Sequence, residues 1–256
     1  MTLHYPDELV NRLHLLWGAG FLSPGGADEV RSIVRGLDLA GRRVADIGCG
    51  TGGPAIILAR ETGARMVCLD VEPQLLDRAR VFAAHSGVAD RIEFHLVTPG
   101  PLPFPDAGFD VVFSKDALIH MPDKPALYRE VMRVLKRGGA FAASDWLCGE
   151  GADDDPVFQD YLRVMDMGFV MATAAQTVAA MRAAGFRGVR TLDRNAWYAK
   201  QSQTEVKAIE GPLRDQAQAI LGPEKYDEWL GIRRMMAAAA KSGSLRPTHL
   251  RGTRPA

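Results

Sequence analysis

The sequence predicts an α/β fold built around a doubly wound, mostly parallel sheet of seven strands. Segments with strand character alternate with segments of helical spacing, which is typical of parallel sheets with helices on both faces. A glycine-rich turn at residues 48–53 joins the first predicted strand to a helix that opens at Pro54, and a first helical turn tolerates proline well. Polar residues end five of the strands, and ligands bind at those ends in sheets of this kind.

The predicted strands are short apolar segments bounded by turn residues. They cover residues 44–46, 65–69, 91–97, 109–113, 140–144, 186–192 and about 248–252. Five carboxyl ends carry polar side chains, namely Asp46, Asp70, Thr98, Ser114 and Asp145. Because these ends meet at one edge of a parallel sheet, a single site can draw on all of them.

Helical spacing of apolar residues predicts the remaining elements. An amphipathic helix is expected over residues 6–17, and the segment 21–26 separates it from the next helix. Further helices are expected over residues 27–37, 54–62, 125–135, 174–184, about 200–221 and about 224–241, with a helical stripe at Phe158, Tyr161, Leu162 and Met165.

We expect residues 1–256 to form a single domain. Its parts are an N-terminal helical cap (1–40), a cofactor-binding core (41–148), a lid or insert (149–184) and C-terminal helices and strands (185–256). The polar segment 149–156 departs from the strand–helix alternation, and we interpret it as the hinge of a lid inserted after the fifth strand.

The glycine turn indicates a nucleoside ligand. Glycines allow backbone dihedrals closed to other residues and let a ligand lie on the main chain. Asp70 follows about 20 residues beyond the turn, where a carboxylate can accept both ribose hydroxyls. Gly48, Gly50 and Gly53 also satisfy the dinucleotide fingerprint, so a nicotinamide-dependent oxidoreductase is one alternative. Asp46 beside the turn suits a cationic ligand better than a pyrophosphate.

Composition excludes several classes of protein. Lys and Arg together number 31, as do Asp and Glu, and no basic stripe points to a nucleic acid. The three cysteines are widely spaced, which argues against a disulfide framework or a zinc site, and we expect no metal. The N-terminus is acidic at Asp7 and Glu8 and no apolar run is long enough to cross a bilayer. We therefore expect a cytoplasmic protein without membrane insertion.

Further motifs follow the glycine turn in order, at residues 102–106, 109–113 and 134–139. Together they resemble the class I S-adenosylmethionine-dependent methyltransferases, which have a Rossmann-like fold. The resemblance implies S-adenosylmethionine as the cofactor. It would be held by Leu22, Ser23, Asp46, Gly48, Cys49, Gly50, Asp70, Val71, Gln74, Val97, Thr98, Ser114 and Lys115.

Four other segments, residues 5–8, 21–26, 114–120 and 144–146, resemble the phosphoethanolamine N-methyltransferases. The resemblance implies that Tyr5 and His120 form a dyad that closes over the ligands and aids deprotonation. It also implies that Asp116 meets the substrate amine, that Tyr161 lines the substrate pocket, and that Trp146 replaces a family tyrosine there.

The chain departs from that family where the acceptor's phosphate is bound. Met165 and Met167 stand where the family has an arginine and a tyrosine. Arg233 or Arg234, on the late helix, is a candidate basic ligand, and we take Arg234 as the substrate-binding residue. Phosphate binding needs several charge-assisted bonds, so the identity of the acceptor stays open.

The chemistry of methyl transfer to an amine calls for positioning and for loss of a proton. Asp116 and His120 are four residues apart, so on a helical turn both would project to one face. We expect N-methylation of a small-molecule amine by a monomer or weak dimer. An O- or C-methyltransferase of a secondary metabolite is the alternative with the same cofactor, and a non-catalytic binding module is the least favoured.

Overall fold

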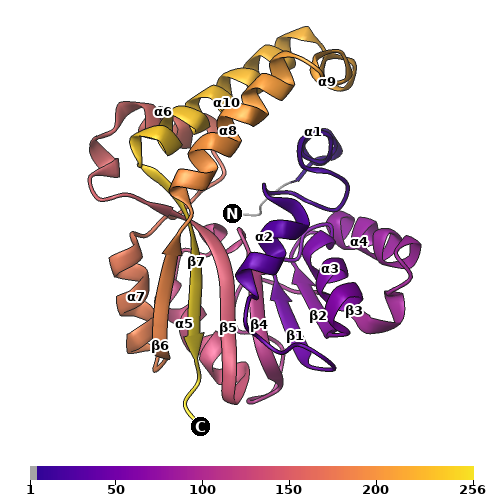
Figure 1. Cartoon of the computed structure of the whole chain (residues 1–256), viewed down its shortest axis with the longest axis vertical. Coiled ribbons are helices and arrows are strands. Elements are labelled where there is room, and N and C mark those ends of the chain that lie inside the picture. Colours follow the sequence, from indigo (N-terminus) through magenta and orange to yellow (C-terminus); the bar gives the residue numbers. More distant parts are fainter. Residues whose placement is uncertain (1–4) are drawn as a thin grey trace.

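The computed structural model describes residues 5–256, and its centre is the predicted sheet of seven strands (Figure 1). The strand order is β3-β2-β1-β4-β5-β7-β6, in which only β7 runs antiparallel to its neighbours. The strands are β1 (Arg43–Ile47), β2 (Arg65–Asp70), β3 (Ile92–Leu96), β4 (Phe109–Lys115), β5 (Leu135–Cys148), β6 (Arg187–Asp193) and β7 (Leu245–Thr253). The order reverses beside β1, so the ends of β1 and β4 form the switch point where ligands bind.

Helices cover both faces of the sheet, as the alternation predicts. One face packs against α2 (Gly26–Ile33), α3 (Gly53–Thr62) and α4 (Pro73–His85). The other packs against α5 (Lys124–Val134) and α7 (Ala174–Ala183). Strand side chains alternate between these two cores, since Val44 and Met66 face the first and Ala45 and Val67 the second. The seven-stranded, mostly parallel fold class is therefore confirmed.

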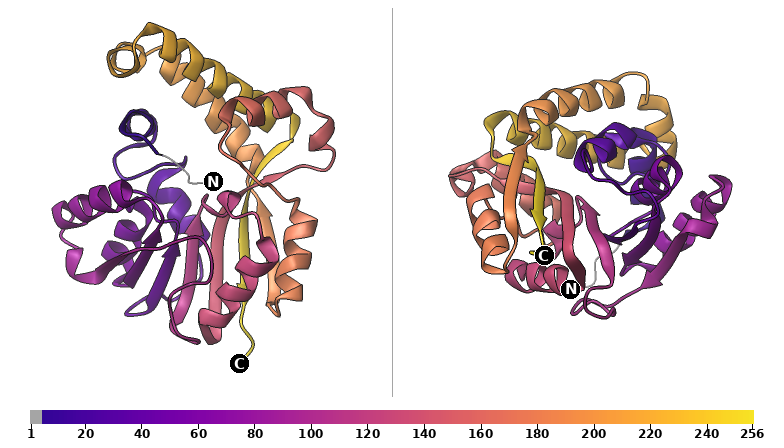
Figure 2. Two further views of the ribbon diagram at one scale, coloured as in Figure 1. Left: turned by 180° about the vertical axis from the view of Figure 1, so that it is seen from behind. Right: turned by 60° about the horizontal axis from the view of Figure 1, so that its bottom comes forward.

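A second lobe stands over the carboxyl ends of the strands (Figures 1 and 2). It consists of α6 (Pro156–Met165), α8 (Asn195–Glu210), α9 (Arg214–Leu221) and α10 (Pro223–Ser242), with the short turn η3 (Ala152–Asp154) before α6. Helix α1 (Asp7–Trp17) lies beneath α9 on the side of β1. The site predicted at the strand ends thus lies between the sheet and this lobe.

Several elements differ from the sequence prediction, and two of the differences concern the helices near the upper lobe. The expected helix over residues 200–221 is two helices, α8 and α9, because Gly211 and Pro212 interrupt it and proline cannot continue a helix. Helix α7, which we assigned to the lid, packs on the sheet instead, where Met181 contacts the same core as Phe141. Within the segment 149–184, therefore, η3 and α6 stand over the strand ends.

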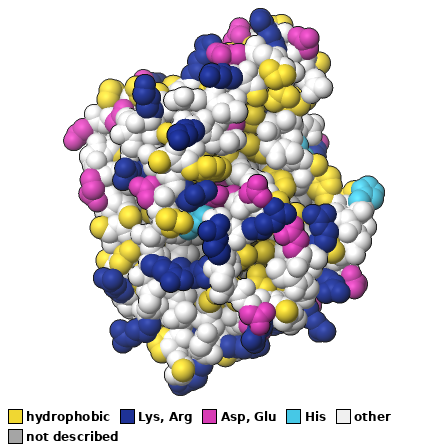
Figure 3. Space-filling view, in the orientation of Figure 1, with side chains coloured by type: hydrophobic (Ala, Val, Ile, Leu, Met, Phe, Trp, Pro, Cys, Tyr) yellow, Lys and Arg dark blue, Asp and Glu magenta, His cyan; other side chains and the backbone are white. Residues whose placement is uncertain are grey.

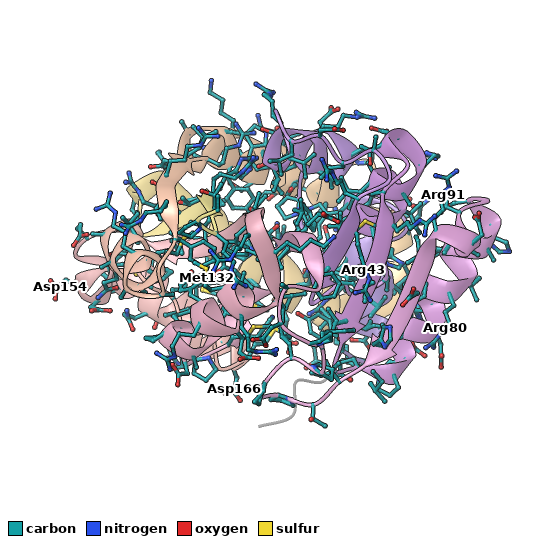
Figure 4. All side chains as sticks on the ribbon, turned by 90° about the horizontal axis from the view of Figure 1, so that it is seen from below. Arg43, Arg80, Arg91, Met132, Asp154 and Asp166 are labelled. Atoms are coloured by element: carbon teal, nitrogen blue, oxygen red, sulfur yellow. The ribbon has the colours of Figure 1, made fainter. Side chains whose placement is uncertain are left out.

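Figure 4 shows the molecule from below, with Arg43 at the amino end of β1. There Arg43 of β1 stacks on the ring of Phe109 at 4.6 Å, and its backbone N–H donates to Asp110 at 2.9 Å. Within residues 5–256, no helix is both long and apolar enough to cross a bilayer.

Candidate active site

The glycine turn after β1 is closely packed. Gly48, Gly50 and Gly52 all have positive φ angles, of 71°, 54° and 81°. A side chain on Gly48 would lie 2.3 Å from Cβ of Ala117, and one on Gly50 would lie 2.9 Å from Cδ1 of Leu22. Glycine is required here for both conformation and space, and Leu22, which we expected to hold the cofactor, lies against Gly50. Cys49 is buried and packs into the core on the α3 side.

Asp46, at the end of β1, is a buried carboxyl group that lacks a full set of partners. It is 1% exposed, and its Oδ2 has no hydrogen-bond partner among the described residues. Burial, with the charge of Asp70 as the next cause, raises the pKa of Asp46 to about 8. A buried, unsatisfied carboxyl group is costly, and a cationic group beside it would offset that cost.

Asp70, at the end of β2, shapes the turn through its carboxylate. Its Oδ2 accepts the Gly50 N–H at 2.8 Å and its Oδ1 accepts the Glu72 N–H at 3.1 Å. Burial nevertheless raises the pKa of the Asp70 carboxyl group. Each carboxylate oxygen has a further lone pair, so the group can still accept hydroxyl donors.

The other cofactor residues expected near β2 and β3 surround Asp70. The Val97 N–H donates to the Asp70 carbonyl at 3.0 Å. Gln74 donates through Nε2 to the Glu72 carboxylate at 2.6 Å and to the Tyr5 carbonyl at 3.4 Å. Val71 is half-buried beside them, whereas Thr98 is exposed on the loop after β3.

Lys115, at the end of β4, connects the core to the segment before α2. Its ammonium donates to Ser23 Oγ at 2.5 Å, to the Pro24 carbonyl at 2.9 Å and to the Asp116 carboxylate at 2.8 Å. Asp116 also accepts from Ser144 Oγ at 2.7 Å. The fully buried Ser114 donates to the Ile47 carbonyl at 2.7 Å, so its hydroxyl joins β4 to β1.

Tyr5 and His120 lie together, as the resemblance implies. The Tyr5 hydroxyl is 3.2 Å from Nε2 of His120, and the two rings meet edge to face. Phe169, from the loop after α6, packs on the imidazole with ring centroids 5.2 Å apart. Burial, and secondarily the charge of Lys124, lowers the pKa of His120 to about 4. Burial also raises the pKa of Tyr5, so both rings are neutral at pH 7.

The reason we gave for placing Asp116 and His120 on one face is wrong. No helix contains both residues. Asp116 follows β4 with a positive φ of 59°, and His120 ends the short 3₁₀ turn η2 (Leu118–His120). Asp116 bonds to Lys115 and Ser144, while His120 bonds to Tyr5. The two side chains are therefore held by separate sets of partners.

The underside of the upper lobe is an aromatic and methionine-rich cluster. Tyr161 is buried and stacks with Phe158, and Trp146 packs edge-on against Tyr198 with centroids 4.8 Å apart. The cluster also contains Ile119 of η2, and Met165, Phe169 and Met171 pack against it. The predicted substrate residues Trp146 and Tyr161 therefore belong to one surface adjoining η2.

The choice of Arg234 as a substrate residue is corrected by the structure. Its side chain is 60% exposed and pairs with Glu210. Arg233 instead points inward, because successive helical residues differ by about 100° in direction. Its guanidinium is buried, pairs with Glu205, donates to the Tyr198 hydroxyl at 3.2 Å and lies 5.0 Å from the centroid of the Trp17 ring.

Sequence reasoning missed three polar residues of this region. Glu205 accepts from Trp17 Nε1 at 2.9 Å and so ties α1 to α8. His14 contacts the Thr51 hydroxyl of the glycine turn at 3.0 Å. Glu72 is buried with Oε1 unpartnered among the described residues. Only Glu72, two residues after Asp70, carries a sequence signal that could have found it. No group of three or more described residues has the geometry of a metal site.

Comparison with known proteins finds a match to part of the chain. Residues 45–143 match the family model described as "Methyltransferase domain". The chain is 29% identical to phosphoethanolamine N-methyltransferase 3 of Arabidopsis thaliana over 245 residues, which are 94% of this chain and 48% of that protein. The chain thus spans about half the length of the curated relatives it matches.

Solved structures show the same fold. Phosphoethanolamine N-methyltransferase 2 of Haemonchus contortus, solved with phosphomonomethylethanolamine and S-adenosylhomocysteine, superposes with a TM-score of 0.91. It is 22% identical, and the match covers 98% of this chain and 59% of that one. The [4+2]-cyclase SpnF superposes with a TM-score of 0.74 at 23% identity, over 97% of this chain and 93% of that one. The fold therefore supports more than one chemistry.

Proposed function

We propose, from the premise that residues 45–143 form a methyltransferase domain, that this protein transfers a methyl group from S-adenosylmethionine to a small-molecule amine. The observation that carries the proposal is the buried Asp46 beside the glycine turn. A cationic donor would stabilise the ionised form of this carboxyl group, whereas the pyrophosphate of a nicotinamide cofactor would disfavour that form. The domain match likewise leaves the oxidoreductase alternative without support.

The residues around the turn fit S-adenosylmethionine. The unpartnered Oδ2 of Asp46 can accept from the donor's ammonium group, and the positive φ angles of Gly48 and Gly50 fold the turn beside that carboxyl group. Asp70 retains lone pairs for the ribose hydroxyls. Once bound, the cofactor supplies an electrophilic methyl group on a positively charged sulfur.

The acceptor amine must lose a proton before or during transfer, because a free alkylammonium has a pKa of about 10. We assign this proton to His120, whose imidazole is neutral at pH 7, although a pKa of about 4 makes it a weak base. Nε2 contacts Tyr5, and Nδ1 has no partner among the described residues. Tyr5 closes the site from the N-terminal segment, and the acceptor's ammonium would compete with Lys115 for the Asp116 carboxylate.

The charged side chains of the protein indicate which class of acceptor it would bind. Lys and Arg side chains are spread over the face that Figure 3 shows, with Asp and Glu side chains among them, and the net charge is zero, which favours a small molecule over a polyanion. The buried Arg233 is already paired with Glu205, so a phosphate would have to compete with that carboxylate. An amine without a phosphate is therefore the acceptor we favour.

A second candidate is an O- or C-methyltransferase for a larger apolar acceptor. The observation in its favour is the cluster of Met165, Met171 and Phe169 packed on Trp146 and Tyr161, because methionine adapts to apolar ligands of irregular shape.

Transfer of labelled methyl to a panel of acceptors tests the proposal. The panel holds phosphoethanolamine, its methylated forms, unphosphorylated amines and apolar alcohols. We expect label in the unphosphorylated amines, and none with Asp46→Asn, whereas the surface variant Asp38→Asn should match the native protein. Label in alcohols alone would favour the second candidate. Absence of label together with absence of S-adenosylmethionine binding would refute methyl transfer.

A further inference from the structure

The turn that carries His120 is held from below by a buried ion pair with no role in the chemistry above. Asp145 of β5 is 1% exposed, and its Oδ1 accepts the Ile119 N–H at 2.9 Å. Lys124, at the start of α5, donates through Nζ to the Leu118 carbonyl, and its Nζ lies 3.8 Å from Asp145 Oδ2. Three elements, β5, η2 and α5, thus meet at this pair.

The turn is held from above as well. The Ile119 carbonyl accepts the Val170 N–H, from the loop after α6, at 3.0 Å. The same loop places Phe169 on the imidazole of His120. Both backbone groups of Ile119 are therefore engaged, one by the core and one by the upper lobe. The orientation of the next residue, His120, depends on these bonds.

The burial of the pair indicates a role beyond stability. Removing two charges from water is expensive, and a buried ion pair is often no more stabilising than apolar side chains of the same volume. Asp145 and Lys124 both lie within this buried region, so the pair needs another reason for its presence. The contacts of Lys124 with Leu118 and of Asp145 with Ile119, both residues of η2, supply that reason.

We propose that Asp145 and Lys124 are positioning residues that hold the Leu118–His120 turn and so aim the imidazole of His120 at the Tyr5 hydroxyl. The catalytic role in this inference rests on the proposed function, whereas the contacts that hold the turn do not depend on it. This arrangement also gives the pair an electrostatic effect, because burial and, secondarily, the charge of Lys124 lower the pKa of His120, while Asp145 partly balances Lys124. The other groups that face the pair are Tyr128 of α5 and Asp116.

Two variants should change the titration of His120 in opposite directions. Lys124→Met removes the nearby cation, so the pKa of His120 should rise toward its ordinary value. Asp145→Asn keeps the size and the acceptor for Ile119 but leaves Lys124 unbalanced, so the pKa of His120 should fall. General loosening of the fold would instead shift the pKa of His120 in the same direction in both variants, toward its value in water.

The measurement is the NMR titration of the His120 ring protons in the native protein with S-adenosylhomocysteine added, assigned with His120→Asn. It needs no acceptor, so it tests the pair even where methyl transfer fails. The matched control is Lys136→Met, which breaks an ion pair with Asp110 at the opposite end of β4 and β5. This control should leave the titration unchanged.

Turnover is the second readout. Both variants should lower kcat by about tenfold or more, because small misplacements of a catalytic group are costly, with KM for S-adenosylmethionine changed less than about twofold. Should Lys124→Met not fold, the downward shift in Asp145→Asn decides alone. Unchanged titration of His120, or shifts in the same direction in both variants, would overturn the proposal.

Discussion

The hydroxyl oxygen of Tyr5 lies 3.2 Å from Nε2 of His120, although 115 positions separate the two residues. Burial raises the pKa of the phenol and lowers that of the imidazole, so neither ring is charged at pH 7. The hydrogen bond between the Tyr5 hydroxyl and Nε2 leaves Nδ1 as the ring nitrogen of His120 without a partner among the described residues. The pair forms one surface from the N-terminal segment and η2.

Loss of the imidazole should reduce catalysis without reducing cofactor binding. His120→Ala removes the group we assign to proton transfer, and such groups contribute typically about 10²–10⁴-fold to rate. We expect kcat to fall within that range, while calorimetry gives an S-adenosylmethionine affinity within about threefold of the native protein. The exposed His85 provides the control, because His85→Ala should behave as native. An unchanged kcat in His120→Ala would remove the imidazole from the mechanism.

Binding of S-adenosylmethionine should release a proton from Asp46. The pKa of this carboxyl group is about 8, so it is largely protonated in the free protein at pH 7. A cationic ligand beside it favours the ionised form and lowers the pKa. Up to about one proton should therefore leave on binding at pH 7, and the effect should fade above pH 8.

Titration calorimetry in buffers of different ionisation enthalpy measures this proton. Asp46→Asn, which has no proton to release, should bind more weakly with a heat that does not depend on the buffer. A buffer-independent heat for the native protein would place the cationic group of the ligand away from Asp46.

The alternation of strands and helices predicted the sheet well, because each buried strand is a short local pattern. β5 shows where such patterns are insufficient. We expected residues 140–144, whereas the strand covers Leu135–Cys148. Its carboxyl half is extended by pairing with β7, from Ala140 with Thr253 to Cys148 with Leu245. A partner about 100 residues away leaves no signal in the local sequence.

The positions of the site residues were predictable only where a feature of the sequence is compatible with a single local structure. The glycine turn and the acidic strand ends are such features, and they lie as expected around Gly48, Asp46 and Asp70. The four-residue spacing of Asp116 and His120 is compatible with two structures. In a helix it would place both side chains on one face, whereas a strand end followed by a 3₁₀ turn directs them differently. The choice between neighbouring arginines likewise depends on the rotation of α10, which only packing determines.

The rotation of α10 predicts that Arg233 and Arg234 contribute very differently to the free energy of unfolding. Arg233→Met leaves Glu205 buried without its cationic partner, which typically costs about 3–5 kcal/mol. Arg234→Ala breaks only an exposed pair with Glu210, and such pairs are worth about 0–1 kcal/mol. Urea unfolding of each variant measures both free energies. Equal destabilisation would mean that α10 is rotated differently from the structure described above.

The last prediction separates backbone strain from steric clash in the glycine turn. Gly48 and Gly87 have similar φ angles, 71° and 68°, so alanine at either position should cost about 1–2 kcal/mol in conformation alone. Nothing lies within 4 Å of a side chain on Gly87, whereas one on Gly48 would lie 2.3 Å from Cβ of Ala117. Gly48→Ala should therefore lose a further ~1–3 kcal/mol as well as S-adenosylmethionine binding.

Combining Gly48→Ala with Ala117→Gly removes the clashing methyl group. The double variant should recover the additional loss and keep only the conformational cost, so its unfolding free energy should approach that of Gly87→Ala. Equal stability of the two single variants would show that Ala117 moves away readily. The tight packing of the turn would then contribute little to the shape of the cofactor site.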